Sequence, residues 1–317
     1  MIEIELAYEK GLGSMYAGSA ENFLGSPIGE RHRSKVQLIL TSPPFPLNRK
    51  KKYGNKTGQE YVDWLASLAP SFCALLKENG SIVLEMGNAW ETGEPVMSTL
   101  ALEALLAFLR FGDLHLCQQF ICYNPARLPS PAQWVTVERI RVKDAYTHVW
   151  WMAKSPRPKA NNRRVLRPYS ASMLKLLSSK RYNAGPRPSE HNIGKTSFLK
   201  RNAGAIPSNV LQFTNTGSSD PYLRYCREQK LQPHPARMPA GLPDFFIRFL
   251  TQPGDLVLDP FAGSNTTGAV AENLGRHWVG IEPCEEYIKG SIGRFEDQNG
   301  SKPKHRSSRR TCQQSLF

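Results

Sequence analysis

The 317-residue sequence has no C-x-x-C pair, no internal repeat and no apolar run near the ~20 residues that a membrane-spanning helix needs. Its six cysteines are scattered, which argues against structural zinc and a disulfide framework and fits reduced thiols in the cytoplasm. The N-terminus, MIEIELAYEK, is acidic and lacks the basic start and apolar stretch of a signal peptide. We therefore expect no metal site and no membrane association.

The sequence has fewer acidic than basic residues. Its 27 Asp and Glu and 41 Lys and Arg give a net charge of +14. The excess is concentrated in residues 154–201, which carry thirteen Lys or Arg and a single acid, Glu190. A basic surface of this kind favours a polyanionic partner. Aromatic and aliphatic residues are interspersed in this basic segment, so we expect a partly ordered insertion. A solvated linker is the alternative.

Apolar runs alternate with helical patterns on both sides of the basic segment. We expect helices at 60–80, 98–112, 243–250 and 267–275, and strands at 14–19, 36–40, 81–87, 116–124, 255–260 and 277–283. This alternation is typical of an α/β fold, in which helices cover both faces of a mostly parallel sheet. From about residue 300 the chain is basic and low in apolar content, which predicts a disordered tail.

A strand, a turn rich in Gly and Ser, and a helix follow one another in LVLDPFAGSNTTG, residues 256–268. Such a turn lets backbone N–H groups approach a ligand closely at the start of the helix. Glu282 ends the next strand, nineteen residues after Gly263, where an acid can hold two ribose hydroxyls. The turn matches neither G-x-x-x-x-G-K-[ST] nor a full G-x-G-x-x-G, which disfavours ATP and NAD. An ordinary strand-to-helix turn without a ligand is the alternative.

The strand at 36–40 runs into the corner Thr41-Ser42-Pro43-Pro44-Phe45. Proline has no N–H for a sheet ladder, so the strand stops here and the corner is rigid. The Ser42 hydroxyl and the Pro43 carbonyl are hydrogen-bond acceptors, and the rigid prolines hold them in place. Phe45 adds a flat aromatic face next to these acceptors. A simple strand-ending turn is the alternative.

Together these motifs resemble the β subgroup of DNA amino-methyltransferases. SPPF resembles their catalytic motif [DNS]-P-P-[YFW], DPFAGS their S-adenosylmethionine loop, and HPARMP (234–239) the segment before that loop. The strings GSMYAG, EYVDWL, LPSPAQWV, HNIGK and GSNTTG are similar to PvuII-type cytosine-N4 methyltransferases, from about residue 13 to about 295. The resemblance implies a Rossmann-like, circularly permuted, seven-stranded sheet with a basic target-recognition insertion.

The resemblance also implies roles for individual residues. The expected catalytic residues are Ser42, Pro43, Pro44 and Phe45. The expected cofactor-binding residues are Asp259, Phe261, Gly263, Ser264, Asn265, Thr266, Glu282, Ser19, His234 and Pro235. The expected DNA-binding residues are Lys50, Lys51, Lys52, Arg187, His191, Asn192 and Lys195. Ser19 departs from the family, which usually has an aspartate there for the adenine of the cofactor. A neutral hydroxyl makes a weaker bond, so weaker cofactor binding is expected.

The implied organisation is a catalytic half (1–153), a target-recognition region (154–232), a cofactor half (233–297) and a basic tail (298–317). Serine in the first motif position favours cytosine N4, and the PvuII-type resemblance implies the target CAGCTG. The implied partners are double-stranded DNA and a restriction endonuclease that acts on the same site without a stable complex, in a bacterial cytoplasm; we expect a monomer. The alternatives are an adenine-N6 enzyme of this fold, a methyltransferase of protein or RNA, and a catalytically silent DNA-binding protein.

Overall fold

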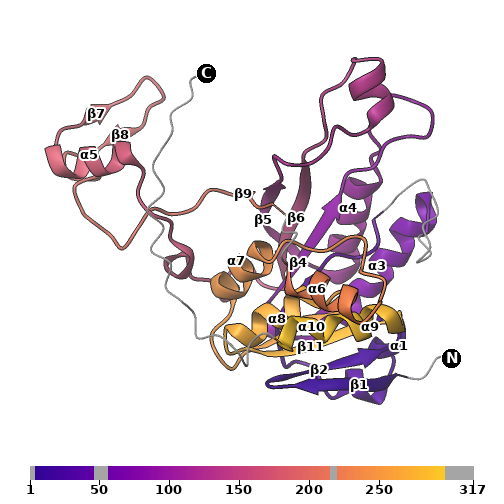
Figure 1. Ribbon diagram of the computed structural model, residues 1–317. Coiled ribbons are helices and arrows are strands. Elements are labelled where there is room, and N and C mark those ends of the chain that lie inside the picture. Colours follow the sequence, from indigo (N-terminus) through magenta and orange to yellow (C-terminus); the bar gives the residue numbers. More distant parts are fainter. Residues whose placement is uncertain (1–3, 46–55, 215–219, 297–317) are drawn as a thin grey trace.

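A computed structural model describes residues 4–45, 56–214 and 220–296. These residues form a mixed sheet of nine strands in the order β1-β2-β11-β10-β3-β4-β6-β5-β9 (Figure 1). The strands are β1 (Glu5–Lys10), β2 (Gly13–Ala17), β3 (Val36–Thr41), β4 (Leu76–Gly87), β5 (His115–Tyr123), β6 (Tyr146–Ala153), β9 (Val210–Gln212), β10 (Leu256–Asp259) and β11 (His277–Glu282). Neighbouring strands from β2 across to β4 are parallel, and β6 is antiparallel to both β4 and β5.

Helices cover both faces of the sheet, and this double cover explains why every residue of β3 is buried. One face, which includes Ile39, packs against α1 (Ala20–Leu24), α3 (Gly58–Leu75) and α4 (Leu100–Gly112). The other face, which includes Leu38 and Leu40, packs against α7 (Gly241–Leu250), α8 (Thr266–Asn273), α9 (Glu285–Ser291) and α10 (Gly293–Glu296). The short α2 (Pro27–Glu30) follows α1. Burial of these two apolar layers is the main favourable term in folding.

The permuted order of the chain brings distant segments together at the centre of the sheet. β10 pairs in parallel with β3, and Leu258 lies opposite Ile39. Parallel neighbours end at the same edge, so the corner after β3 and the turn after β10 lie side by side. The carboxyl ends of strands are the usual ligand-binding edge of an open α/β sheet.

The sheet differs from the expected one in two respects. It has nine strands rather than seven, since β1 pairs with β2 and β9, which follows the basic segment, pairs with β5. The helix expected at 60–80 ends at Leu75, and β4 begins at Leu76, which lies opposite Val36 of β3. Strand pairing overrides the helical pattern of residues 76–80, because the sheet supplies backbone partners and a buried position for Leu76.

The basic segment has two structural parts. Its first residues pack on the sheet: Lys159 Nζ lies 2.5 Å from Asp255 Oδ2, and Arg164, in the 3₁₀ turn Asn162–Val165, donates to the carbonyl of Thr251 at 2.5 Å. The second part, with α5 (Ala171–Ser179), β7 (Gly185–Pro186) and β8 (Asn192–Ile193), forms a lobe that projects away from the sheet (Figure 1). Several cations of the basic segment therefore support the core.

After the lobe the chain returns to the core. α6 (Pro221–Glu228) packs against α9 and α10, so the end of the expected target-recognition region lies against the cofactor half. A π-helical turn, Gln133–Val137, lies in the loop between β5 and β6. No helix in the described part of the chain has the length and apolar character needed to cross a membrane. The expected disordered tail lies outside the described residues.

Candidate active site

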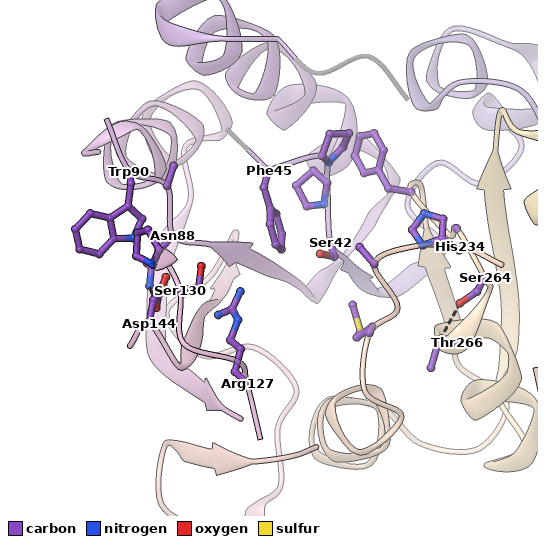
Figure 2. Close-up of a pocket in the computed structure, with 18 of the residues that line it drawn as sticks. Ser42, Phe45, Asn88, Trp90, Arg127, Ser130, Asp144, His234, Ser264 and Thr266 are labelled. Carbon is purple, nitrogen blue, oxygen red and sulfur yellow. Dashed lines mark hydrogen bonds between the residues drawn. The ribbon is translucent and has the colours of Figure 1, made fainter. Parts of the chain in front are cut away.

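A cavity of about 980 Å³ lies where β3, β4, β10 and β11 end. The corner after β3 forms one part of its wall and the turn after β10 forms another (Figure 2). The wall includes most of the residues expected from the sequence, namely Ser42, Pro43, Pro44, Phe45, His234, Asp259, Phe261, Gly263, Ser264, Thr266 and Glu282. The fold thus brings the two motifs, more than 200 residues apart, into one site.

The corner is tied to the cofactor turn and to the neighbouring strand. Thr41 Oγ1 donates a 2.5 Å hydrogen bond to Asp259 Oδ1, which also accepts from the backbone N–H of Phe261 at 3.1 Å. The Phe45 ring lies against Gly87 at the end of β4, where an added Cβ would be 2.4 Å from Phe45 Cδ2. Glycine at position 87 therefore leaves the space in which the Phe45 ring faces the cavity.

A buried carboxylate that the sequence analysis missed lies beneath the corner. Glu85 of β4 accepts a 2.9 Å hydrogen bond from Thr147 Oγ1 and another from the Ser42 hydroxyl. Burial raises the pKa of Glu85, and its hydrogen bonds and the nearby charge of Arg127 oppose that rise. The signal in the sequence was an acid within the otherwise apolar run SIVLEMG. A charged group seldom occupies such a position without a partner.

The turn after β10 forms a cradle next to the carboxylate of Glu282. Gly263 has φ +52°, and an added Cβ would be 3.1 Å from His234 Nε2. Glu282 Oε2 accepts from the N–H of Gly263 at 2.9 Å, and Oε1 accepts from the N–H of Cys284 at 2.9 Å. Each carboxylate oxygen has a further lone pair, so Glu282 can also accept from ligand hydroxyls. These features fit a nucleoside ligand with a ribose ring.

Burial perturbs both acids of this cradle. It raises the pKa of Asp259 to about 6, although the hydrogen bond from Thr41 acts in the opposite direction. It raises the pKa of Glu282 to about 7, although two backbone N–H groups oppose the change and the charge of Asp259 adds to it. A ligand that donates hydrogen bonds or carries positive charge stabilises the ionised forms. The pair therefore favours a cationic ligand with hydroxyl donors.

Neighbouring groups hold the loop before α7 and the turn before α8. The N–H of His234 donates to the Tyr222 hydroxyl at 2.7 Å, and its ring packs edge-on against Tyr287 at 4.6 Å. Burial lowers the pKa of His234 to about 4, so the imidazole is neutral and does not repel a cation. Arg294 fixes Ser264 through bonds of 2.5 Å to its carbonyl and 2.8 Å to its hydroxyl.

Three expected cofactor residues lie outside the cavity wall. Asn265 is buried with φ +52°, and its side chain caps α8 by accepting from the N–H of Gly268 at 3.1 Å. The Ser19 hydroxyl caps α1 by accepting from the N–H of Asn22 at 3.1 Å. Pro235 is exposed beside His234. The side chains of Asn265 and Ser19 thus stabilise the turn before α8 and the turn before α1, respectively.

The wall far from the cofactor turn contains polar residues that the sequence analysis did not single out. Asn88 Nδ2 donates to Asp144 Oδ1 at 2.8 Å, and Arg127 Nη1 donates to the carbonyl of Tyr146 at 2.9 Å. Asn88, Arg127 and Asp144 all line the cavity, together with Trp90 and others (Figure 2). Part of this wall comes from LPSPAQWV, a string of the family resemblance without an obvious chemical pattern.

The expected DNA-binding residues lie elsewhere. Lys50, Lys51 and Lys52 are outside the described residues. Arg187, His191, Asn192 and Lys195 are exposed and lie together on the lobe, around the antiparallel pair β7 and β8. The N–H of Arg187 donates to the carbonyl of His191 at 2.8 Å, which closes the hairpin. None of these four residues belongs to the cavity wall.

The chain is similar to known DNA methyltransferases over most of its length. It is 45% identical to the type II methyltransferase M.PvuII of Proteus hauseri over 300 residues, which cover 94% of this chain and 88% of that protein. The solved structure of PvuII DNA methyltransferase, described as cytosine-N4-specific, has a TM-score of 0.73 at 39% identity and covers 93% of this chain and 90% of that one. A 91-residue stretch is 43% identical to the DNA adenine methyltransferase YhdJ of Escherichia coli, covering 29% of this chain and 28% of that protein.

The family model described as DNA methylase matches residues 36–293, a range that contains the corner, the cavity and the cofactor turn. The match, the identity to M.PvuII and the shared pocket of the two motifs agree with one another. This chain therefore belongs to the N6/N4 family of DNA methylases.

Proposed function

We propose that this chain transfers a methyl group from S-adenosylmethionine to the N4 amino group of cytosine in duplex DNA. It acts in the bacterial cytoplasm as the modification enzyme of a restriction-modification pair. The observation that carries the proposal is the shared cavity of the Ser42–Phe45 corner and the turn 259–264. The similarity to M.PvuII supports the choice of base, and the target CAGCTG stays a prediction from that similarity.

The cofactor-binding residues proposed from the geometry are Glu282 for the ribose hydroxyls and the Gly263 turn for the backbone approach. Asp259 lies between this turn and the corner. When bound, S-adenosylmethionine supplies a methyl group on a sulfonium, which is an electrophile. The neutral ring of His234 and the carboxylates of Asp259 and Glu282 suit its positive charge.

The Ser42–Phe45 corner compensates for the low reactivity of the cytosine amine. The lone pair of cytosine N4 is delocalised into the ring, so the nitrogen must be pyramidalised and aligned before it attacks. The Ser42 hydroxyl and the Pro43 carbonyl can each accept one N4–H, and the two prolines hold these acceptors in place. Phe45 stacks on the ring of the flipped base.

Glu85 orients the serine and receives the released proton. Its carboxylate accepts from the Ser42 hydroxyl, so that the oxygen of Ser42 turns its lone pairs towards the amine. As N4 forms its bond to the methyl carbon and the carbon–sulfur bond breaks, N4 must lose one proton. Ser42 can accept that proton while it passes its own to Glu85, which conserves charge and leaves methylated cytosine neutral.

The decisive experiment is methyl transfer from labelled S-adenosylmethionine to unmethylated plasmid, followed by mass spectrometry of the nucleosides. We expect N4-methylcytosine from the wild type and a loss of about 100-fold or more in Ser42→Ala, because one fixed acceptor and the link to Glu85 disappear. Phe45→Ala should lose stacking worth about 1–3 kcal/mol. The exposed residues Ser67 and Phe111 provide matched controls as Ser67→Ala and Phe111→Ala.

Other products would point to the alternatives. N6-methyladenine would assign the chain to the adenine branch of the family and overturn the base assignment. Transfer to protein or RNA without transfer to DNA would overturn the substrate. A folded protein without cofactor binding would indicate a silent DNA-binding scaffold. Protection of CAGCTG sites from a nuclease that cuts them tests the predicted target.

A further inference from the structure

The cavity wall carries one cation that the mechanism above leaves without a role at the base. Within the described part of the chain, Arg127 is the one lysine or arginine of that wall. It lies in the loop after β5, and Figure 2 shows its side chain extending into the cavity in the region between Ser130 and Ser42. Arg127 therefore faces the space in which a flipped base would meet the corner.

One hydrogen bond and one electrostatic attraction act on Arg127 in this position. Its Nη1 donates to the carbonyl of Tyr146 at 2.9 Å, and its charge acts on the buried Glu85 beneath Ser42. A guanidinium has five N–H donors in one plane, so the bond to Tyr146 leaves donors for a ligand. The side chain is half-buried, which strengthens a charged hydrogen bond relative to one in open water.

The chemistry of cytosine supplies the matching groups. Along its pairing edge cytosine presents the N4 amine, then N3, then O2, which are a donor and two adjacent acceptors. The corner offers acceptors for the amine, so a complementary pocket needs donors opposite N3 and O2. The fork of a guanidinium suits two adjacent acceptors.

Adenine differs at one of these three positions. Its edge presents the N6 amine and N1 and then a C2–H, which accepts no hydrogen bond. An arginine placed for cytosine would therefore point one buried N–H at a carbon. An unsatisfied buried donor costs about 1–3 kcal/mol, which corresponds to roughly 5–150-fold in rate.

We propose that Arg127 binds N3 and O2 of the flipped cytosine and thereby selects cytosine over adenine. The inference rests on the proposed function and extends it to the choice of base. It also predicts that the serine of the corner is insufficient for this choice, because a hydroxyl accepts equally from N4 and N6 amines.

The test compares two duplex substrates that differ in the target base. One carries cytosine at the target position and the other carries adenine, which keeps the amine and the adjacent ring nitrogen but has a C2–H where cytosine has O2. The ratio of kcat/KM for the two substrates is measured for the wild type, Arg127→Met and Arg127→Lys. The intrinsic difference between the two amines cancels when the ratios of two proteins are compared.

Arg127→Met should lower the preference for cytosine over adenine about tenfold relative to the wild type. Arg127→Lys keeps the charge opposite Glu85 but lacks the fork, so its preference should be intermediate. The matched control is Arg33→Met, which removes an exposed arginine before β3, away from the corner that follows that strand. Its ratio should equal that of the wild type.

The outcomes separate this inference from the proposed function. A wild type that makes no N4-methylcytosine would overturn both. If the wild type makes that product and Arg127→Met loses rate equally on both substrates, Arg127 acts through Glu85 alone and its reading of the base is refuted. If Arg127→Met does not fold, Arg127→Lys provides the test. A ratio of kcat/KM in Arg127→Lys equal to that of the wild type would refute the contact between Arg127 and the base.

Discussion

The hydroxyl of Thr41 donates a 2.5 Å hydrogen bond to the carboxylate of Asp259, a residue 218 positions later in the chain. Both groups are buried, and they join the last residue of β3 to the last residue of β10. This bond fixes the catalytic corner relative to the cofactor turn. The distance between the amine of the target base and the methyl group of S-adenosylmethionine depends on the relative position of the corner and the turn.

Thr41→Val should therefore reduce both stability and cofactor binding. The substitution keeps the shape but removes a donor from a buried carboxylate, a change that costs about 1–3 kcal/mol. Urea denaturation and calorimetric titration with S-adenosylmethionine provide the measurements. Thr99→Val is a matched control, because Thr99 Oγ1 makes a bond of the same length to Glu103 at an exposed position. Equal losses in the two variants would contradict the role of the Thr41–Asp259 bond.

Glu85→Gln should lower kcat about tenfold or more while cofactor binding stays unchanged. Glutamine keeps the size of the side chain but cannot take the proton from Ser42. In the wild type, burial raises the pKa of Glu85, so kcat should fall as the pH drops through that raised pKa and the carboxylate is protonated. A pH profile at saturating cofactor measures this limb. The idea fails if Glu85→Gln retains the same acidic limb.

The stability of the ligand-free protein should depend on Asp259 and Glu282 in an unusual direction. Burial raises their pKa values to about 6 and about 7, so the folded state favours the protonated forms. Their contribution is fully present below the ordinary carboxyl pKa, near 4, and is lost as the pH rises through 6 and 7. Melting temperatures from pH 4 to 8 should therefore decline less in Asp259→Asn and Glu282→Gln than in the wild type.

Cofactor binding should change with pH in the opposite direction. The ionised carboxylate of Glu282 is the better acceptor for ribose hydroxyls and the better partner for a cation, so affinity should weaken as the pH falls below about 7. Titrations of S-adenosylmethionine at several pH values measure the effect. A pH-independent affinity in the wild type would show that Glu282 does not contact the cofactor.

Ser19→Asp should tighten S-adenosylmethionine binding about tenfold without loss of stability. The single oxygen of Ser19 already caps α1, whereas a carboxylate can cap the helix with one oxygen and accept from the adenine amine with the other. The matched control is Ser26→Asp, since Ser26 caps α2 in the same way through the N–H of Gly29 at 3.0 Å. Similar affinities of both variants and the wild type would refute a role for position 19 at the adenine.

Much of the fold could be predicted from the sequence, because apolar periodicity reports which faces a segment buries. The expected strands around β3, β10 and β11 and the helices around α4, α7 and α8 are confirmed. The end of α3 was predicted wrongly, because the strand pairing of Leu76 is a tertiary effect. β1, β6 and β9 were not predicted, and β9 has three residues, too few for a periodic signal.

Some residues of the site could likewise be predicted from the sequence, and others could not. The motifs SPPF and DPFAGS are local strings whose residue types carry the chemistry, so they were visible in the sequence and do meet in one cavity. Glu85 and Arg127 are single residues without a motif, and their partners Thr147 and Tyr146 lie 62 and 19 positions away. The side chains of Asn265 and Ser19 cap helices, and their assignment to the cofactor stays a prediction.

The sequence by itself determined many of the helices and strands, the two motifs and the excess of basic residues, because each depends on neighbours within a few positions. The tertiary structure decided which of these come together. The pairing of β3 with β10 places Ser42 beside the cofactor turn. The antiparallel pairing of β4 with β6 places Glu85 beside Thr147. Burial at these junctions shifts the pKa values of Glu85, Asp259 and Glu282, since removal of water acts only when the folded chain surrounds the groups.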